Sequence, residues 1–212
     1  FADGIIDQKR QRWIGVREDH TAPGQPVNAL VAVDLAQPGT APGEILAQGH
    51  DFYASPRRSP DGRHLAWLAW DHPNMPWNGT TLSVAELSDG GAIVGTPRVV
   101  AGGVAESIFQ PEWSPDGREL YFVSDRSGWW NLYCLALTSG EVRSIAPMAA
   151  EFGQPQWVFG MATYAFAGPS RIVCSFVKAG LGQLAVIDLA TGALRRLETP
   201  FTQFASLRAN GD

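Results

Sequence analysis

Three carboxylates recur at similar places along the chain, and together they could bind a positively charged group. Asp51 and Glu106 each stand five residues before a proline, and Glu151 stands four residues before another. If these positions converge, they could pair with the α-ammonium group of a peptide through charge-assisted hydrogen bonds. A solvated charge at the start of a strand is the alternative interpretation, and both stay open. Glu106 is the best single candidate.

An aromatic segment is the second candidate site. It reads Trp70-Asp71-His72-Pro73-Asn74-Met75-Pro76-Trp77. Its prolines stiffen the backbone, and its tryptophans could wall a substrate pocket or dock another domain. The alternative is a loop that packs its tryptophans on its own sheet. The candidate substrate-binding residues of this segment are Trp70, Asp71, His72, Asn74 and Trp77.

The sequence contains no motif for a metal site or for a serine nucleophile. The histidines at positions 20, 50, 64 and 72 show neither a His-Glu-x-x-His motif nor another metal-ligand spacing. No Gly-x-Ser-x-Gly nucleophile elbow is present. We therefore expect no metal, no cofactor and no catalytic triad among these residues.

The composition is that of a folded, acidic protein. The 212 residues are 45% hydrophobic and 17% charged, with a formal net charge of -5. This balance disfavours nucleic acid or an anionic membrane as a partner, because both attract a basic face. No apolar run approaches the roughly 18 residues of a membrane span, and the first residues lack the pattern of a signal peptide.

Two cysteines bear on the compartment. Cys134 and Cys174 each lie inside an apolar run that is typical of a strand. Small buried thiols in a reducing compartment explain both residues best, and a disulfide is the alternative. We therefore expect a cytoplasmic protein.

A repeat organises the chain. Residues 54–65 and 109–120 are identical at seven of twelve positions, and both contain Ser-Pro-Asp-Gly-Arg. A third copy begins at Gln154-Pro155-Gln156-Trp157, 44 residues after Gln110. Periods of about 40–50 residues, with short β-branched runs between turns, indicate four-stranded propeller blades.

The sequence therefore predicts an all-β fold, a partial β-propeller of four-stranded antiparallel blades. We expect blades at about 1–49, 50–103, 104–147 and 148–198, and the start of the next blade within 199–212. The first strand of each blade lines the channel of a propeller, which places Asp51, Glu106 and Glu151 at its mouth. We expect both termini to be cuts in a longer chain, with open blade edges that favour self-association.

Three motifs resemble the N-terminal propeller of the prolyl oligopeptidase family of serine peptidases, in its acylaminoacyl-peptidase and aminopeptidase-like branch. The first is the aromatic segment 70–77. The second is Ser124-Asp125-Arg126-Ser127-Gly128-Trp129-Trp130-Asn131-Leu132-Tyr133. The third is Phe1-Ala2-Asp3-Gly4, continued by Arg17-Glu18-Asp19-His20 and Asn28-Ala29-Leu30-Val31.

The resemblance implies a propeller that caps a C-terminal α/β-hydrolase domain outside these residues. Such a propeller restricts access to small peptides and contacts the N-terminal side of the substrate. The expected partners are therefore a peptide substrate and the protein's own hydrolase domain, and the segment alone is not a complete enzyme.

Two alternatives stay open. One is a TolB-like propeller that binds a protein partner and has no catalytic domain. The other is a propeller that is itself an enzyme, which would need Asp, Glu or Asn ligands for a cation in the channel. The predicted inner strands offer Pro, Trp and Gln instead.

Overall fold

The computed structural model describes residues 1–37 and 42–210. Within them the chain forms four antiparallel sheets of four strands, which we call blades one to four. A 3₁₀ turn, η1 (Gln8–Arg10), follows the first strand. The strands are β1 (Ala2–Asp7), β2 (Arg12–Asp19), β3 (Val27–Asp34) and β4 (Glu44–Gln48) in blade one; β5 (Phe52–Arg58), β6 (His64–Trp70), β7 (Thr81–Leu87) and β8 (Ile93–Gly102) in blade two; β9 (Ile108–Trp113), β10 (Glu119–Ser124), β11 (Asn131–Ala136) and β12 (Val142–Ser144) in blade three; and β13 (Tyr164–Phe166), β14 (Arg171–Lys178), β15 (Leu181–Asp188) and β16 (Leu194–Leu197) in blade four.

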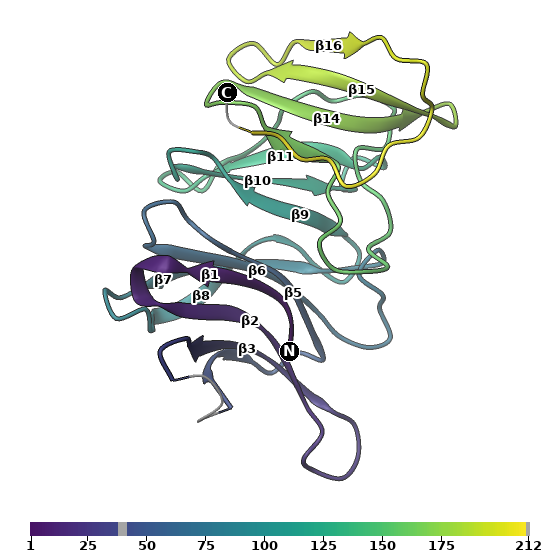
Figure 1. The fold of residues 1–212 in the computed structure, drawn as a ribbon. Helices are drawn as coiled ribbons and strands as arrows, with labels where there is room; N and C mark the ends of the chain where they lie inside the picture. Colours follow the sequence, from purple (N-terminus) through teal and green to yellow (C-terminus); the bar gives the residue numbers. More distant parts are fainter. Residues whose placement is uncertain (38–41, 211–212) are drawn as a thin grey trace.

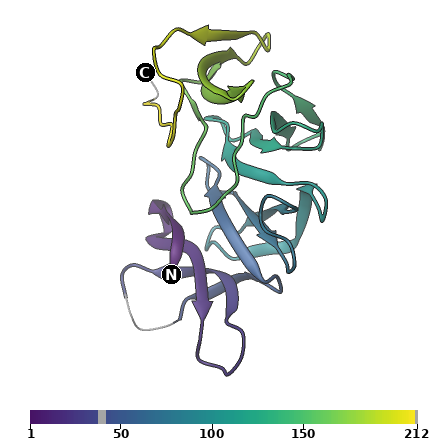
Figure 2. The same ribbon diagram turned by 90° about the vertical axis from the view of Figure 1, so that its right-hand side faces the viewer.

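The blades follow one another in an arc, from the purple blade one to the yellow-green blade four (Figures 1 and 2). Strands that are consecutive in the sequence are neighbours in each sheet. β1 contacts β5, and β5 contacts β9, so the first strands of successive blades face one another. The predicted all-β partial propeller is confirmed.

The Ser-Pro-Asp-Gly-Arg repeats form the turn between the first and second strands of blades two and three. In blade two, Ser59 Oγ donates to Asp61 Oδ1 at 2.6 Å, and Gly62 N donates to Ser59 O at 2.9 Å. Gly62 has a φ of +74°, a conformation that glycine adopts without strain. The turn of blade three has the same bonds, with Gly117 at +72°. The repeated residues therefore encode one repeated turn.

Three apolar clusters fill the spaces between neighbouring blades. The cluster between blades three and four includes Phe109, Phe152 and both cysteines. Cys134 and Cys174 are buried free thiols, and burial raises the pKa of each to about 12. In the structure they are small core residues rather than a disulfide.

A bulge interrupts the first strand of blades two and three. Between Ala54 and Arg57, two residues of β5 stand opposite one residue of β6. The first bulge residue is Ser55, with a φ of +52°, and Gln110 takes its place in β9 with a φ of +48°. A bulge of this kind bends the strand and redirects the side chains beside it.

Blade four departs from the predicted repeat. Gln154-Pro155-Gln156-Trp157, predicted to lie in its first strand, lies in a loop, and the first strand is the short β13. Glu151 pairs with Val177 of β14, and the chain rejoins the sheet at Tyr164. The segment 152–163, which we call the excursion, therefore leaves the sheet where blades two and three carry a bulge. In blade three, Gln110-Pro111 forms the bulge of β9. The same pair of residue types in blade four therefore corresponds to the bulge position and does not by itself indicate a strand.

Residues 199–210 contain no strand. They run beside blade four, where Gly182 N donates to Thr202 O at 2.9 Å and Leu207 N donates to Ala162 O at 3.0 Å. Positions 211–212 of the expected next blade lie outside the described residues, so that blade stays a prediction. In the described part of the chain, no helix is long and apolar enough to cross a membrane.

Candidate functional site

Asp51, Asp71 and His72 come together where β5 begins and β6 ends. The backbone N–H of His72 donates to Asp51 Oδ2 at 2.9 Å, and that of Asp51 donates to Asp71 Oδ1 at 2.7 Å. His50 Nδ1 lies 2.8 Å from Asp71 Oδ2. The structure thus joins a residue of the predicted carboxylate set to two residues of the aromatic segment.

This network keeps Asp71 ionised. Partial burial raises the pKa of its carboxyl group, but hydrogen bonds with His50 and the Asp51 N–H lower that pKa by a larger amount. The net pKa lies below the ordinary value for aspartate. Asp71 therefore contributes a fixed negative charge at neutral pH.

Glu106 has the equivalent position in blade three and is held by an ion pair. Arg126 Nη2 and Nε lie 2.8 and 2.9 Å from Glu106 Oε1. Ser124 Oγ donates to the same oxygen at 2.6 Å. These contacts all use Oε1, which leaves Oε2 to accept a hydrogen bond from a ligand. The charge of Arg126 offsets that of Glu106, which weakens its attraction for a cation.

Glu151 is bound across the joint between blades three and four. Trp130 N donates to Glu151 Oε2 at 2.9 Å, and the Glu151 backbone pairs with Val177. Asp51, Glu106 and Glu151 thus lie at the same end of successive blades, each with a partner of its own. No group of three or more His, Cys, Asp or Glu side chains within residues 1–37 and 42–210 could hold a metal ion.

The aromatic segment 70–77 packs partly on its own blade. Trp70 stacks on Phe52, with ring centroids 5.4 Å apart and planes at 18°. His72 meets the same Phe52 ring edge-on at 4.9 Å. Asn74 Nδ2 donates to Val104 O at 3.1 Å. These contacts fix one end of the segment against blade two.

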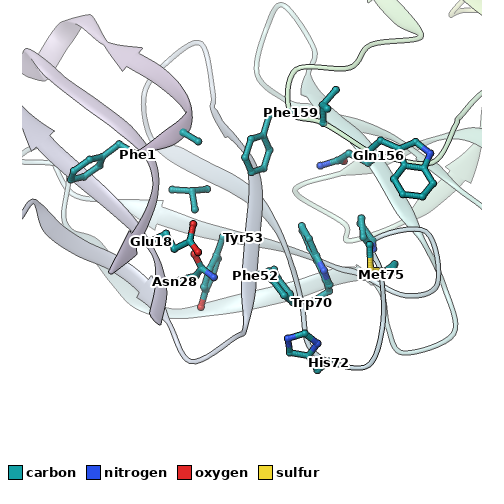
Figure 3. A pocket seen from close by; sticks show the side chains of 15 residues that line it. Phe1, Glu18, Asn28, Phe52, Tyr53, Trp70, His72, Met75, Gln156 and Phe159 are labelled. Carbon is teal, nitrogen blue, oxygen red and sulfur yellow. The ribbon is translucent and has the colours of Figure 1, made fainter. Parts of the chain in front are cut away.

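The segment also lines a pocket of about 520 Å³ between blades one and two and the excursion (Figure 3). The rings of Trp77 and Trp157 lie 4.3 Å apart, which places the excursion over blade two. The pocket volume is in the range of small-molecule sites. Its lining residues are Phe1, Ala2, Val16, Glu18, Asn28, Phe52, Tyr53, Trp70, His72, Met75, Pro76, Gln156, Trp157, Val158 and Phe159.

Sequence reasoning found Trp70 and His72 but missed two other sides of this pocket. Glu18 and Asn28 face one another in the β2–β3 pairing and line the pocket. Both belong to motifs that carried the family resemblance, and that resemblance was their only signal. Trp157 and Phe159 reach the pocket because the excursion leaves the sheet, where the sequence predicted a strand.

Solved structures of peptidases match nearly the whole chain. The crystal structure of puromycin hydrolase is 34% identical with a TM-score of 0.88, and the match covers 97% of this chain and 32% of that chain. A puromycin-hydrolyzing peptidase of Mycobacterium tuberculosis is 36% identical with a TM-score of 0.82, and the match covers 95% and 32%. The chain therefore spans about a third of the length of these proteins.

A curated relative points to the same class of protein. Dipeptidyl-peptidase 5 of Porphyromonas gingivalis is 28% identical over 97 residues, which are 46% of this chain and 13% of that protein. No family model matches the chain. Prolyl oligopeptidase B of Galerina marginata, at 17% identity and a TM-score of 0.75, shares the fold. TolB of Acinetobacter baumannii, at 18% identity and a TM-score of 0.61, also shares it.

The matches and the motifs agree. The two puromycin-hydrolysing proteins match 97% and 95% of the chain, so the similarity extends over all four blades. Over its four blades the chain is similar to the N-terminal part of peptidases that hydrolyse puromycin, and it shares the propeller fold of prolyl oligopeptidase B.

Proposed function

We propose that residues 1–212 are the gating and substrate-contacting propeller of a serine peptidase whose catalytic α/β-hydrolase domain lies elsewhere in the same polypeptide. The observation that carries this proposal is the similarity to puromycin hydrolase, at 34% identity over 97% of the chain. A propeller over a catalytic domain limits the substrate to peptides that can enter, and its own residues can bind what enters.

One end of the blades is the proposed contact surface for the N-terminal side of a peptide. Asp51, Asp71, Glu106 and Glu151 all lie at this end, and their charges would attract an ammonium group. Glu106 is the proposed direct contact, because its Oε2 remains available while Arg126 and Ser124 hold Oε1. Trp70 and His72 at the pocket wall, with Asn74 and Trp77 beside them, would position the rest of the peptide.

One kinetic experiment tests both parts of the proposal. Aminoacyl 4-nitroanilides with free and with acetylated N-termini are given to the complete polypeptide that contains this propeller and to residues 1–212 alone. We expect turnover by the complete polypeptide and none by the segment. Glu106→Gln should raise KM for the free substrates about fivefold, since a partly exposed ion pair contributes up to about 1 kcal/mol. The blocked substrates should show little change.

Glu86→Gln is the matched control, because Glu86 is an exposed glutamate on β7 that does not line the pocket. Turnover by the pure 22.9 kDa segment would contradict the proposal that the catalytic domain lies outside residues 1–212. Equal effects of Glu106→Gln on free and blocked substrates would remove its assigned role. No hydrolysis by the complete polypeptide would favour a TolB-like binding propeller instead.

A further inference from the structure

The pocket beside the aromatic segment has a second chemical character that the proposed function does not use. Aromatic rings from blade two and from the excursion form its walls, while its blade-one edge carries the polar side chains of Glu18 and Asn28 (Figure 3). Among the residues that the structure describes, no arginine or lysine lines it. The pocket therefore offers rings and hydrogen-bond acceptors in one place.

The aromatic floor is rigid. Tyr53 is only 2% exposed and packs in the core between blades one and two. Phe52 and Trp70 are stacked on one another beside it. Fixed ring faces of this kind can hold the apolar stem of a long side chain and attract a cation at its end.

The opposite wall comes from the excursion. Trp157 and Phe159 line the pocket and are 71% and 46% exposed. Trp157 rests against Trp77, which fixes the wall at its other side. The excursion is thus held over the pocket with apolar surface that a ligand could cover.

The polar edge accepts hydrogen bonds. Asn28 Nδ2 donates one of its two hydrogens to Asp51 O at 2.7 Å, and because a carbonyl oxygen can only accept, this bond orients the amide and leaves Asn28 Oδ1 to accept from a ligand. Glu18 is an acceptor in its ionised form. Its neighbour His20, with Nε2 3.3 Å from Oε1, is an exposed side chain that is charged only if protonated. The edge therefore suits a donor that carries positive charge.

We propose that this pocket binds a basic side chain, arginine or lysine, of the peptide that the propeller contacts. The stem of that side chain lies against Phe52, Trp70 and Phe159, and its charged end pairs with Glu18 and with Asn28 Oδ1. This assignment rests on the proposed function for the peptide class of the ligand. It adds a specificity pocket for one side chain, separate from the ammonium contact assigned to Glu106.

The test measures binding and hydrolysis separately in the complete polypeptide. Binding of argininamide, norleucinamide, phenylalaninamide and glutamic acid amide is followed by tryptophan fluorescence, since Trp70 and Trp157 line the pocket. All four probes carry the α-ammonium group, so their differences report the side chain alone. We expect argininamide to bind about tenfold more tightly than norleucinamide, from a partly exposed ion pair and cation–π contacts together. Glutamic acid amide should bind most weakly.

Two variants locate the effect. Glu18→Gln should remove most of the preference for arginine over norleucine, and Glu86→Gln should leave it unchanged. Phe159→Ala should weaken argininamide and norleucinamide alike, by about fivefold, because an interface side chain that covers the stem is lost. Phe201→Ala is its matched control, because Phe201 is an exposed phenylalanine that does not line the pocket.

The outcomes separate this inference from the proposed function. Equal binding of argininamide and norleucinamide, or tightest binding of phenylalaninamide, overturns the basic-side-chain assignment. Hydrolysis that is insensitive to Glu18→Gln leaves the peptidase proposal standing and removes the pocket's role. Glu18-dependent binding of argininamide without any hydrolysis supports the pocket and removes the peptidase proposal.

Discussion

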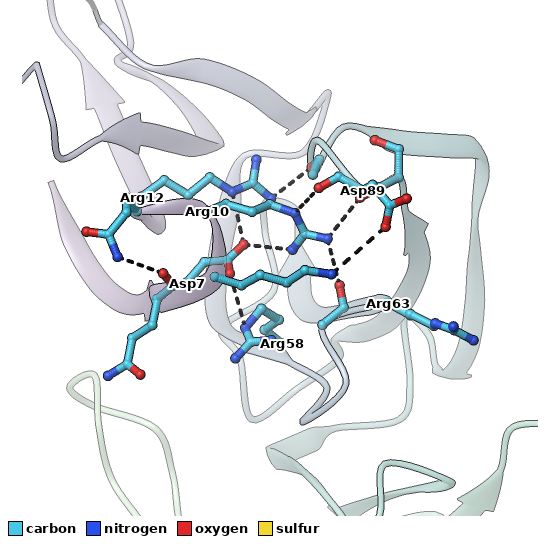
Figure 4. A network of polar contacts seen from close by, with 12 residues as sticks. Asp7, Arg10, Arg12, Arg58, Arg63 and Asp89 are labelled. Carbon is cyan, nitrogen blue, oxygen red and sulfur yellow. Dashed lines mark hydrogen bonds and ion pairs between the residues drawn. The ribbon is translucent and has the colours of Figure 1, made fainter.

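At the scale of single residues, Asp7 shows how charge fastens one blade to the next. Its buried carboxylate lies among three arginines (Figure 4). Arg10 Nη1 and Arg12 Nε lie 2.9 and 3.2 Å from Asp7 Oδ2, and Arg58 Nε lies 3.6 Å from Oδ1. Arg10 also donates to the carbonyl oxygens of Gly62 and Ser88 in blade two. Asp7 thus orients arginines that join blades one and two.

Removing the charge of Asp7 should destabilise the protein strongly. Asp7→Asn keeps the shape of the side chain but leaves three arginines close together without their counter-charge. We expect a loss of about 3 kcal/mol in the free energy of unfolding, as for other broken buried ion pairs. Urea unfolding checks this value. Asp89→Asn, at an exposed pair with Lys9, should leave the urea midpoint nearly unchanged.

Asp7→Asn should also change how the free energy of unfolding depends on pH. Burial raises the pKa of Asp7, but the hydrogen bonds and charges of Arg10, Arg12 and Arg58 outweigh burial and hold the pKa below its ordinary value. Its stabilising contribution is therefore complete above the unfolded pKa of about 4 and is lost as the pH falls through the lower folded pKa. Asp7→Asn should lack this part of the acid-induced loss. If the free energy of unfolding fell in parallel for the unsubstituted protein and for Asp7→Asn as the pH is lowered, Asp7 would have no such role.

The candidate site was only partly predictable from single residues. Asp51 and Asp71 were both candidates, and the structure joins them because β5 and β6 are paired. Glu106 was predicted either to pair with an ammonium group or to be a solvated charge, but in the structure it pairs with Arg126, which follows β10. Such a pairing depends on strand register, which residue spacing gives only after the bulges are known.

At the scale of elements, the bulges of the first strands hold neighbouring blades together. Ser55 N donates to Asp3 Oδ2 in blade one. Gln110 has the same place in blade three. Its Oε1 accepts a hydrogen bond from Thr163 N at 2.7 Å, and its Nε2 donates to Tyr164 O at 2.7 Å. Because Thr163 ends the excursion, Gln110 fixes the point where the excursion returns to its sheet.

Removing the Gln110 side chain should therefore loosen the joint between blades three and four. Gln110→Ala leaves the buried N–H of Thr163 without its acceptor, and we expect a loss of about 2 kcal/mol in the free energy of unfolding. Denaturant unfolding measures this loss. Ser55→Ala is the control, because the contact of Ser55 with Asp3 comes from its backbone and survives the change. Equal losses in both variants would mean that the side-chain bonds of Gln110 have no special role.

The elements themselves were largely predictable, and the exception has a physical cause. The four-stranded antiparallel sheets were predictable, since Ser-Pro-Asp-Gly-Arg turns define the first hairpin of blades two and three. Blade four has Gln154-Pro155 where blade three has Gln110-Pro111, but the excursion stands there in place of a short bulge. The match that extended the repeat to blade four was short, Gln154-Pro155-Gln156-Trp157 against residues 110–113, and such a match cannot reveal that an insertion lies at the same place. Trp157 was therefore predicted to lie in a strand, although it walls the pocket.

At the scale of the whole molecule, the arc of four blades has two ends with apolar surface. Blade one exposes Ile6, Val27 and Ile45, each about half accessible to solvent. Val177 and Leu181 in blade four, and Phe201 beside it, are exposed to a similar or greater degree. In a propeller each blade covers its neighbours on both sides. The segment alone leaves its first and last blades with a neighbour on one side only.

This arrangement predicts that residues 1–212 self-associate when isolated. Exposed apolar side chains and strand edges at the two ends of an arc can pair between molecules, and nothing in such head-to-tail contact closes the assembly. Light scattering at increasing concentration should show a rising average mass, and a longer polypeptide that supplies the neighbouring blades should show a constant one. Leu181→Lys and Val27→Lys, which place charge at the two ends, should reduce the association without loosening the core. A segment that stays a monomer at every concentration would mean that residues 199–210 cover the end of blade four well enough to make the arc self-sufficient.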